Sequence, residues 1–407
     1  MNAEESTFRV ADRVAPFGVT IFAEMTRLAV EHDAINLAQG FPDFDSPAFV
    51  RDAAKAAIDA GHNQYPRTFG TPPLCEAIAE WWKRSTGLSI DPGSEVTVTS
   101  GCTEALAAAF LGLMNPGDEV ILFEPFYDSY RAGVAMAGAT PRFVTIRAPS
   151  HSAGRDAPFE IDEADLLAAV RPRTRAIVLN TPHNPTGKVF TPEELTVIAK
   201  LCIQHNLIAI TDEVYERLTF DPARPHISLA SLPGMAERTV TLSSLGKTFS
   251  TTGWKVGWAI APPSLTKGVR AAHQFLTFST ATPFQYAGAT ALRDGEASIT
   301  ELVAELRWCR DFLAGALEDV GLRVHRPAGT YFIMADIDGL RVRDGSRTYR
   351  DDVELCLDLP SRVGVAAIPP SAFYATSDEG KRFVRFAFCK KRSTLEEAAR
   401  RLQRLAK

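Results

Sequence analysis

The feature that most constrains the fold is a repeated alternation of apolar strands and helices. Short runs rich in Val, Ile and Leu predict strands, and the stretches between them show the spacing of amphipathic helices. The expected strands are residues 95–99, 119–123, 141–146, 175–179, 207–210, 239–242 and 256–260. The expected helices are residues 47–60, 74–85, 103–114, 128–137, 166–170 and 192–205. Strands that are apolar on both faces are typical of a mostly parallel sheet, so we predict an α/β domain with a seven-stranded sheet flanked by helices.

A second, smaller α+β unit is expected after this domain. The later pattern predicts helices at residues 298–320, 352–359 and 394–405, and strands at residues 322–325, 331–337, 365–368 and 383–388. We expect an amphipathic helix at residues 17–31 to pack with this unit. The predicted division is therefore a large domain at 49–295 and a small domain formed by 1–48 and 296–407.

Length, charge and cysteine use argue against several classes of protein. A chain of 407 residues is long enough for two domains, and its net charge of -5 gives no sign of a nucleic-acid surface. The six cysteines are scattered without a C-x-x-C pair, which argues against a zinc site or a disulfide scaffold. We see no signal-peptide pattern and no apolar run long enough to span a bilayer. We expect a cytoplasmic protein that binds no metal, nucleic acid or membrane.

Candidate binding groups follow the ends of the first two predicted strands, where doubly wound sheets collect their ligands. Gly101, Cys102 and Thr103 open a helix, and the free N–H groups at such an end suit a phosphate. A turn of this kind is more often a simple helix cap. Tyr127 follows the next strand and could stack on a planar ring, although an aromatic side chain at this place is ordinarily part of the core.

Polar groups also follow the strands at residues 175–179 and 207–210. Asn184 lies in a turn fixed by proline and glycine and can donate from its amide, although such a segment is usually only a turn. Asp212 comes directly after an apolar strand, where a carboxylate needs hydrogen bonds or a cation such as a protonated ring nitrogen. Tyr215 could reach the same ligand. A helix-capping role for Asp212 is the alternative.

Lys247 lies in a tight loop of small residues between the last two strands of the predicted sheet. A lysine held in this way is poorly placed to extend into solvent, so its amine can be desolvated and become nucleophilic toward a carbonyl. Ser244 and Lys255 are candidate phosphate contacts in the same stretch. Taken alone, either lysine is more commonly a surface charge.

Arg385 lies inside an apolar strand between phenylalanines. A guanidinium in that setting needs an acceptor, either an internal carboxylate or the carboxylate of a substrate. Together with the groups above, it predicts a pocket for a planar, phosphorylated aldehyde with a basic ring nitrogen. This is a site for pyridoxal 5'-phosphate.

Over nearly its whole length the chain resembles the class I/II, fold-type I aminotransferases, which use pyridoxal phosphate. The motifs that carry the resemblance are Asn184-Pro-Thr-Gly187, Asp212-Glu-Val-Tyr215, and Ser244-x-x-Lys247 followed by Lys255. The resemblance implies that Lys247 forms a Schiff base with the cofactor and moves the α-proton of the substrate. It also implies that Asp212 keeps the ring nitrogen protonated.

The same resemblance assigns the remaining contacts. Asn184 and Tyr215 would bond the ring hydroxyl, and Tyr127 would stack on the ring. The expected phosphate contacts are Gly101, Cys102, Thr103, Ser244 and Lys255. The expected substrate contacts are Arg385, Gly40, Asn184 and Phe22, with Arg385 holding the carboxylate. Tyr65 resembles a residue that reaches the phosphate of a neighbouring subunit, which implies a homodimer.

Within the family, the likeness is to the branch of glutamine/kynurenine, methionine and N-succinyldiaminopimelate aminotransferases. It is carried by Leu37-Ala-Gln-Gly-Phe-Pro-Asp43, Glu124-Pro-Phe-Tyr-Asp-Ser-Tyr130, Thr252-Gly-Trp-Lys-Val-Gly-Trp258 and Val365-Ala-Ala-Ile-Pro369. The kynurenine enzymes have a His where Ser279 falls and a Tyr near Cys102, which weakens the case for kynurenine.

No basic residue for a distal carboxylate is evident. We therefore predict transfer of an amino group from a large neutral L-amino acid, such as methionine, glutamine or an aromatic one, to a 2-oxo acid. A cysteine-conjugate β-lyase and an N-succinyldiaminopimelate aminotransferase are the alternatives within this fold. A ligand-sensing regulator is less supported, because there is no room for a DNA-binding region before residue 17.

Overall fold

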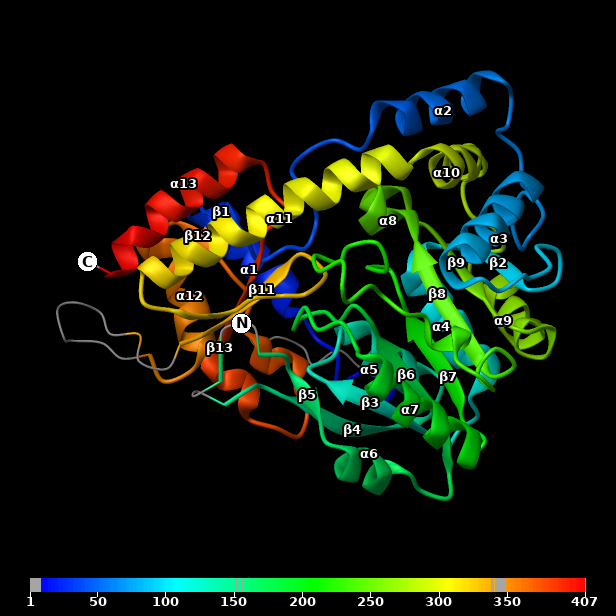
Figure 1. The fold of residues 1–407 in the computed structure, drawn as a ribbon, viewed down its shortest axis with the longest axis horizontal. Helices are drawn as coiled ribbons and strands as arrows, with labels where there is room; N and C mark the ends of the chain where they lie inside the picture. Colours follow the sequence, from blue (N-terminus) through cyan, green and yellow to red (C-terminus); the bar gives the residue numbers. More distant parts are fainter. Residues whose placement is uncertain (1–8, 151–152, 155–156, 338–339, 341–348, 407) are drawn as a thin grey trace.

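The computed structural model describes residues 9–150, 153–154, 157–337, 340 and 349–406, and in these residues a sheet of eight strands forms the centre of the fold (Figure 1). Their spatial order is β2 (Val96–Ser100), β9 (Val256–Ile260), β8 (Thr239–Ser244), β7 (Ile208–Asp212), β6 (Thr174–Asn180), β3 (Glu119–Glu124), β4 (Thr140–Arg147) and β5 (Glu160–Ile161). Strands β8, β7, β6, β3 and β4 run parallel, whereas β9 is antiparallel to both of its neighbours. The prediction of a mostly parallel sheet is confirmed.

Each strand predicted for this sheet is present, with ends within about two residues of those expected. The predicted number of seven needs one correction, because β5 adds a further strand at the edge, antiparallel to β4. β5 spans only Glu160 and Ile161. Two residues are too few to show an alternating or apolar pattern, so β5 could not be predicted from the sequence.

Helices cover both faces of the sheet. Those around it are α2 (Ala48–Asp59), α3 (Pro72–Thr86), α4 (Gly101–Leu113), α5 (Asp128–Met136), α6 (Glu163–Ala169), α7 (Pro192–Gln204), α8 (Leu245–Thr248), α9 (Pro263–Leu276) and α10 (Thr282–Asp294). Consecutive residues of β6 point to opposite faces of the sheet. Val178 packs in the cluster with α4 and α5, and Leu179 packs in the cluster with α7. Burial on both faces explains why this strand is apolar throughout.

Helices α9 and α10 were not predicted, because no element was assigned between residues 260 and 298. The buried positions of α9 are Thr266, Val269 and His273, of which two are polar. Its apolar side is nevertheless carried by Leu265, Val269 and Ala272, which pack in the cluster with α4, so the helical spacing was present in the sequence and the prediction missed it.

The C-terminal part forms its own core with the first helix. Its elements are α1 (Ile21–Glu31), α11 (Glu296–Asp319), α12 (Asp352–Arg362) and α13 (Arg392–Leu402), the antiparallel strands β10 (Arg323–His325), β11 (Phe332–Asp336) and β13 (Phe383–Ala387), and the paired β1 (Ile35–Asn36) and β12 (Val365–Ala366). Met25 of α1 packs in one cluster with Leu313 and Leu395, so the expected packing of the N-terminal helix is confirmed. Helix α1 begins at Ile21 rather than at residue 17, because the Thr20 hydroxyl caps it by accepting from the Ala23 N–H. The division of the chain at 49 and 295 stays a prediction.

The strand ends bring the expected site residues to one edge of the sheet. Asn180, which ends β6, is paired with Asp212, which ends β7. Val256 begins β9 opposite Ser100, and Gly257 lies opposite Ser244, so Lys255 enters at the same edge. Among the described helices, none combines the length and apolar character that a bilayer-spanning segment requires.

Candidate active site

A cavity of about 410 Å³ opens at this edge of the sheet. It is lined by nearly all of the predicted site residues: Phe22, Gly40, Gly101, Cys102, Thr103, Tyr127, Asn184, Asp212, Tyr215, Ser244, Lys247, Lys255 and Arg385. Tyr65 lies elsewhere and is 83% exposed. Its predicted place beside the phosphate of a neighbouring chain stays a prediction.

Asp212 is a buried carboxylate held by uncharged donors. The Tyr130 hydroxyl donates to Oδ2 at 2.7 Å, and the Val214 N–H donates to Oδ1 at 3.3 Å. The Cys102 thiol lies 3.6 Å from Oδ1. Burial raises the pKa of Asp212 above its ordinary value, although these donors and the Lys247 charge oppose the rise. A cation beside Asp212 would stabilise its charged form, so the site suits a protonated ring nitrogen.

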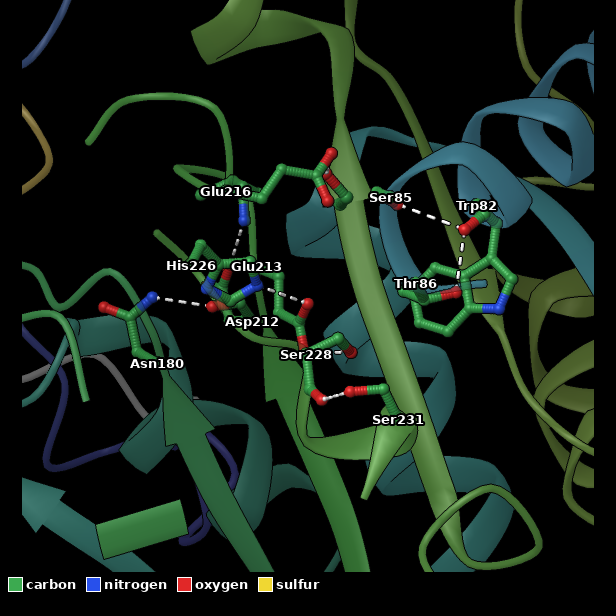
Figure 2. A network of polar contacts seen from close by, with 12 residues as sticks. Trp82, Ser85, Thr86, Asn180, Asp212, Glu213, Glu216, His226, Ser228 and Ser231 are labelled. Carbon is green, nitrogen blue, oxygen red and sulfur yellow. Dashed lines mark hydrogen bonds and ion pairs between the residues drawn. The ribbon is translucent and has the colours of Figure 1, made fainter. Parts of the chain in front are cut away.

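Figure 2 shows the hydrogen bonds that hold the backbone of Asp212 and the side chain of the next residue. The Asn180 side chain donates to the Asp212 carbonyl at 2.9 Å and joins the ends of two strands. The next residue, Glu213, takes part in a separate buried network, with His226 Nε2 at 2.8 Å and the Ser228 hydroxyl at 2.9 Å. Hydrogen bonds on both sides therefore hold the direction of the Asp212 carboxylate.

Lys247 reaches the cavity from α8, directly after β8. Its Nζ lies 5.7 Å from the ring centroid of Tyr215 and 5.7 Å from that of Tyr331. Burial lowers the pKa of Lys247, with the negative charge of Asp212 acting in the opposite direction. A lowered pKa increases the neutral fraction of the amine, which is the form that attacks a carbonyl.

Positive groups meet where α4 begins. Gly101 has φ +76°, and a Cβ atom there would lie 3.0 Å from Lys255 Nζ, so the amine packs closely against this turn. The N-terminus of a helix carries partial positive charge and free N–H groups. The Lys255 ammonium group and this N-terminus are both positive, so an anion bound between them would be stabilised by both. Cys102, Thr103 and Ser244 line the same part of the cavity, which therefore fits a phosphate.

Arg385 is 1% exposed and has neutral hydrogen-bond acceptors. Nη1 donates to the Asn184 Oδ1 at 3.0 Å, and Nη2 donates to the Ala38 carbonyl at 2.8 Å. Among the described residues, none accepts from Nε. The guanidinium lies 4.1 Å from the Phe332 ring centroid. Burial lowers the pKa of Arg385 to about 10. Both acceptors are uncharged, so these hydrogen bonds do not form the internal salt bridge that was the alternative. The site therefore suits the carboxylate of a substrate.

Tyr127 also reaches the cavity, from the residue before α5. Its ring meets that of Tyr130 edge to face, with centroids 5.8 Å apart. A half-buried ring at this position has one surface available to a ligand. Stacking of Tyr127 on a cofactor ring stays a prediction.

Sequence reasoning gave no role to several lining residues. Tyr130 is the donor to Asp212, and its position three residues after Tyr127 is a spacing that places both near one end of α5. Asn180 ends the strand before Asn184 and was treated only as part of a turn. Phe332 gave no signal, since it is recognised only through the pairing of β11 with β13.

Comparison with known proteins gives consistent matches along the chain. The family model described as "Aminotransferase class I and II" matches residues 32–402. A probable N-succinyldiaminopimelate aminotransferase of Mycobacterium tuberculosis is 50% identical and aligns with 97% of this chain and 98% of its own length. Kynurenine–oxoglutarate transaminase 1 of Homo sapiens is 39% identical, with 94% and 95% covered.

One solved structure adds a methionine aminotransferase to this group. The crystal structure of a methionine aminotransferase from Escherichia coli matches with a TM-score of 0.90 and 39% identity, covering 97% of this chain and 99% of the other. The comparisons therefore confirm the fold and the expected branch of relatives.

Proposed function

Since the chain belongs to the class I and II aminotransferases, a family of pyridoxal-phosphate-dependent enzymes, we propose that it transfers the amino group of a large neutral L-amino acid to a 2-oxo acid. The observation that carries the choice of substrate is the composition of the cavity wall. Among the described lining residues, the cations are Lys247, Lys255 and Arg385. Each already has a task at the cofactor or at the α-carboxylate, which leaves none for a second carboxylate.

The walls beside Arg385 support an apolar substrate side chain. Phe22, Phe41 and Phe332 line the cavity on this side. The Phe22 ring centroid lies 5.4 Å from the Arg385 guanidinium, so a substrate held by its carboxylate would extend its side chain along aromatic surface. Burial of such a side chain contributes about 0.8 kcal/mol per methylene, which favours methionine or an aromatic amino acid over a short one.

We assign the chemical roles as follows. Bound pyridoxal phosphate supplies an electron sink for the charge left when the α-proton departs. Lys247 binds the cofactor aldehyde and carries the proton at its amine, and Asp212 keeps the ring nitrogen protonated. Asn184 and Tyr215 donate to the ring hydroxyl, and Tyr127 covers one face of the ring. Arg385 orients the substrate through its carboxylate.

We also propose a homodimer in which Tyr65 completes the phosphate site of the second copy. Tyr65 and Phe278 form an edge-to-face pair on the surface, with centroids 5.4 Å apart. Phe275, close by in sequence, is 85% exposed. A surface that presents large aromatic side chains is typical of one that is covered by a partner.

A second candidate substrate is N-succinyldiaminopimelate. The 50% identity to a relative of that printed activity, over 97% of this chain, favours it. Such a substrate carries two further carboxylates, one on diaminopimelate and one on the succinyl group, and their recognition would require cations outside the described lining residues or from a second copy.

The test is a panel of amino donors with pyruvate, a 2-oxo acid without a second carboxylate, as acceptor. Methionine, glutamine, phenylalanine, kynurenine and N-succinyldiaminopimelate are compared by kcat/KM for transamination. We expect methionine to exceed N-succinyldiaminopimelate by about tenfold or more, the scale that one unpaired buried carboxylate would cost. A preference in the opposite direction would replace the first proposal by the second. Pyruvate and ammonia released from a cysteine conjugate without any acceptor would instead indicate a β-lyase.

A further inference from the structure

A buried ion pair that has no role above lies directly behind the phosphate end of the cavity, next in sequence to the lining residue Thr103. It joins Glu104, in the first turn of α4, to His273 of α9. Glu104 Oε1 lies 2.8 Å from His273 Nδ1, and Glu104 Oε2 accepts from the Ser100 N–H at 2.7 Å. The two residues are 9% and 1% exposed. The carboxylate therefore lies in the same turn as the phosphate contacts expected at Cys102 and Thr103.

A carboxylate at this place has opposite effects on the helix and on its ligand. The carboxylate stabilises the helix, because the N-terminal end of α4 carries partial positive charge. However, the same negative charge repels an anion that binds at that end, and the repulsion is strong where water is excluded. Phosphate binding beside Glu104 thus needs a positive charge that compensates the carboxylate.

The hydrogen bonds of His273 identify that charge. Its Nε2 lies 2.7 Å from the Thr68 carbonyl, which can only accept, so Nε2 carries a proton. Its Nδ1 faces the Glu104 carboxylate and carries the second proton of an imidazolium. Burial lowers the pKa of His273, but the hydrogen bond and charge of Glu104 and the bond to Thr68 outweigh it. The net shift is upward, against the opposing charge of Arg270.

Helix α9 holds the imidazole in place. A Cβ atom on Gly112 of α4 would lie 2.2 Å from the Gly268 carbonyl oxygen, so the two backbones are in contact, five residues before His273 on α9. On the same helix, the Arg270 guanidinium donates to the Gly93 and Val96 carbonyls at 2.8 Å and 2.7 Å. The distance between His273 and the first turn of α4 is therefore set by rigid packing.

We propose that His273 is a positioning residue for the cofactor phosphate, because its imidazolium neutralises Glu104 and ties the first turn of α4 to the segment around Thr68. This inference rests on the proposed function, in which that turn binds the phosphate. Tyr65 lies three residues before Thr68, in the same segment. The hydrogen bond from His273 to Thr68 therefore connects the phosphate site of this chain to the segment that we propose contacts a second copy.

The test compares pyridoxal phosphate with pyridoxal, which has the same ring but no phosphate. Each is titrated into the cofactor-free full chain, and binding is followed by quenching of tryptophan fluorescence. For His273→Gln we expect the Kd of pyridoxal phosphate to rise about tenfold or more, with the Kd of pyridoxal within about twofold of wild type. The double variant Glu104→Gln/His273→Gln removes both charges and should return the Kd of pyridoxal phosphate to within about threefold of wild type.

A matched control uses the other buried histidine–glutamate pair. His226 lies 2.8 Å from Glu213, behind Asp212 rather than at the phosphate. We expect His226→Gln to change the affinities for pyridoxal phosphate and pyridoxal by the same factor, because any effect there acts on the ring. A purely structural role for His273 would give this same result in His273→Gln.

The pH dependence gives a second readout. In the wild type the preference for pyridoxal phosphate over pyridoxal should fall as pH rises through the raised pKa of His273, since the imidazolium is present only below it. Glu104→Gln should abolish this fall, because a neutral His273 can then accept from the glutamine amide. This variant also serves if His273→Gln does not fold.

Two results would overturn the inference: an unchanged Kd of pyridoxal phosphate in His273→Gln, or an equal loss for both ligands without recovery in the double variant. A persistent pH dependence in Glu104→Gln would do the same. If the wild-type chain bound no pyridoxal phosphate at all, the proposed function itself would fail, which is a distinguishable outcome.

Discussion

At the scale of single residues, Asp212 and Arg385 show how burial prepares each group for an external partner. Both are buried, and both make their hydrogen bonds to uncharged groups of the chain. An isolated buried charge is unfavourable, so each site gains when an opposite charge arrives. The ring nitrogen of the cofactor and the carboxylate of the substrate supply those charges in the proposed reaction.

Asp212→Ala should lower kcat far more than it weakens cofactor binding. Without the carboxylate the ring nitrogen loses its proton, and the stabilisation of the departing charge is lost, so we expect about a 10³-fold fall in kcat. Cofactor content, measured by absorbance after gel filtration, should fall much less. As a control, Glu216→Gln changes a nearby half-buried carboxyl whose pKa is raised to about 7 by desolvation, and kcat should stay within about threefold. More than a tenth of wild-type kcat in Asp212→Ala would contradict the assignment.

Arg385→Lys should raise KM by about tenfold to a hundredfold, since a point charge replaces a planar fork that also bonds Asn184 and Ala38. The readout is steady-state kinetics with amino donor and 2-oxo acid varied in turn. Both substrates carry the same carboxylate, so their KM values should rise together. A rise for only one of them would show that Arg385 does not hold the shared group.

Which site residues the sequence could predict depended on whether their signal was local. Lys247, Asp212 and Asn184 stand in short motifs directly after strands, and the structure places all three on one cavity. Tyr130 and Phe332 were missed for different reasons. The first acts through a hydrogen bond to a residue 82 positions away, and the second through pairing with a distant strand.

At the scale of elements, prediction succeeded where burial is apolar. The strands of the central sheet are buried on both faces, which leaves an uninterrupted apolar run in the sequence. Helix α9 was missed although Leu265, Val269 and Ala272 repeat at helical spacing, whereas its close backbone contact with α4 through Gly112 and Gly268 leaves no apolar signal in the sequence. Contacts of that kind depend on the partner helix, so one segment alone cannot reveal them.

Gly268→Ala tests this contact between α4 and α9. The added methyl would lie 2.6 Å from the Gly112 carbonyl oxygen, so the helices must separate, and we expect the free energy of unfolding to fall by about 1–3 kcal/mol. Denaturant unfolding of the two variants gives the comparison. Gly315→Ala is the control, because nothing lies within 4 Å of a Cβ there and α11 should gain up to about 1 kcal/mol. Equal stabilities of the two variants would show that the close contact is not needed.

At the scale of the whole molecule, the active site forms where the smaller unit meets the sheet. Val214 and Tyr215, just after Asp212, pack in one cluster with Phe332 and Phe386 of the C-terminal strands. This packing brings Arg385 of β13 to the cavity at the edge of the central sheet. The sequence predicted both units but not their contact, because Asp212 and Arg385 are far apart along the chain and no local pattern encodes the docking.

Complementation between two inactive variants tests the proposed dimer. If Tyr65 of one copy serves the site of the other, a mixed dimer of Lys247→Ala and Tyr65→Ala has one intact site and one doubly damaged site. Mixing equal amounts under refolding conditions should then restore about a quarter of wild-type activity, the fraction expected for random pairing in a two-fold dimer. Activity is assayed at limiting cofactor, with each variant refolded alone as the control. No recovery despite dimers in light scattering would place Tyr65 outside the partner's site.

The central claim is that Lys247 binds the cofactor aldehyde in the cavity that Asp212 also lines. Reduction of the cofactor-loaded enzyme with borohydride makes that linkage permanent, and peptide mass spectrometry then locates it. We expect the pyridoxyl group on the peptide that carries Lys247 and no label in Lys247→Ala. A label on Lys255, the other lysine of the cavity, or an unlabelled wild-type chain would contradict the account.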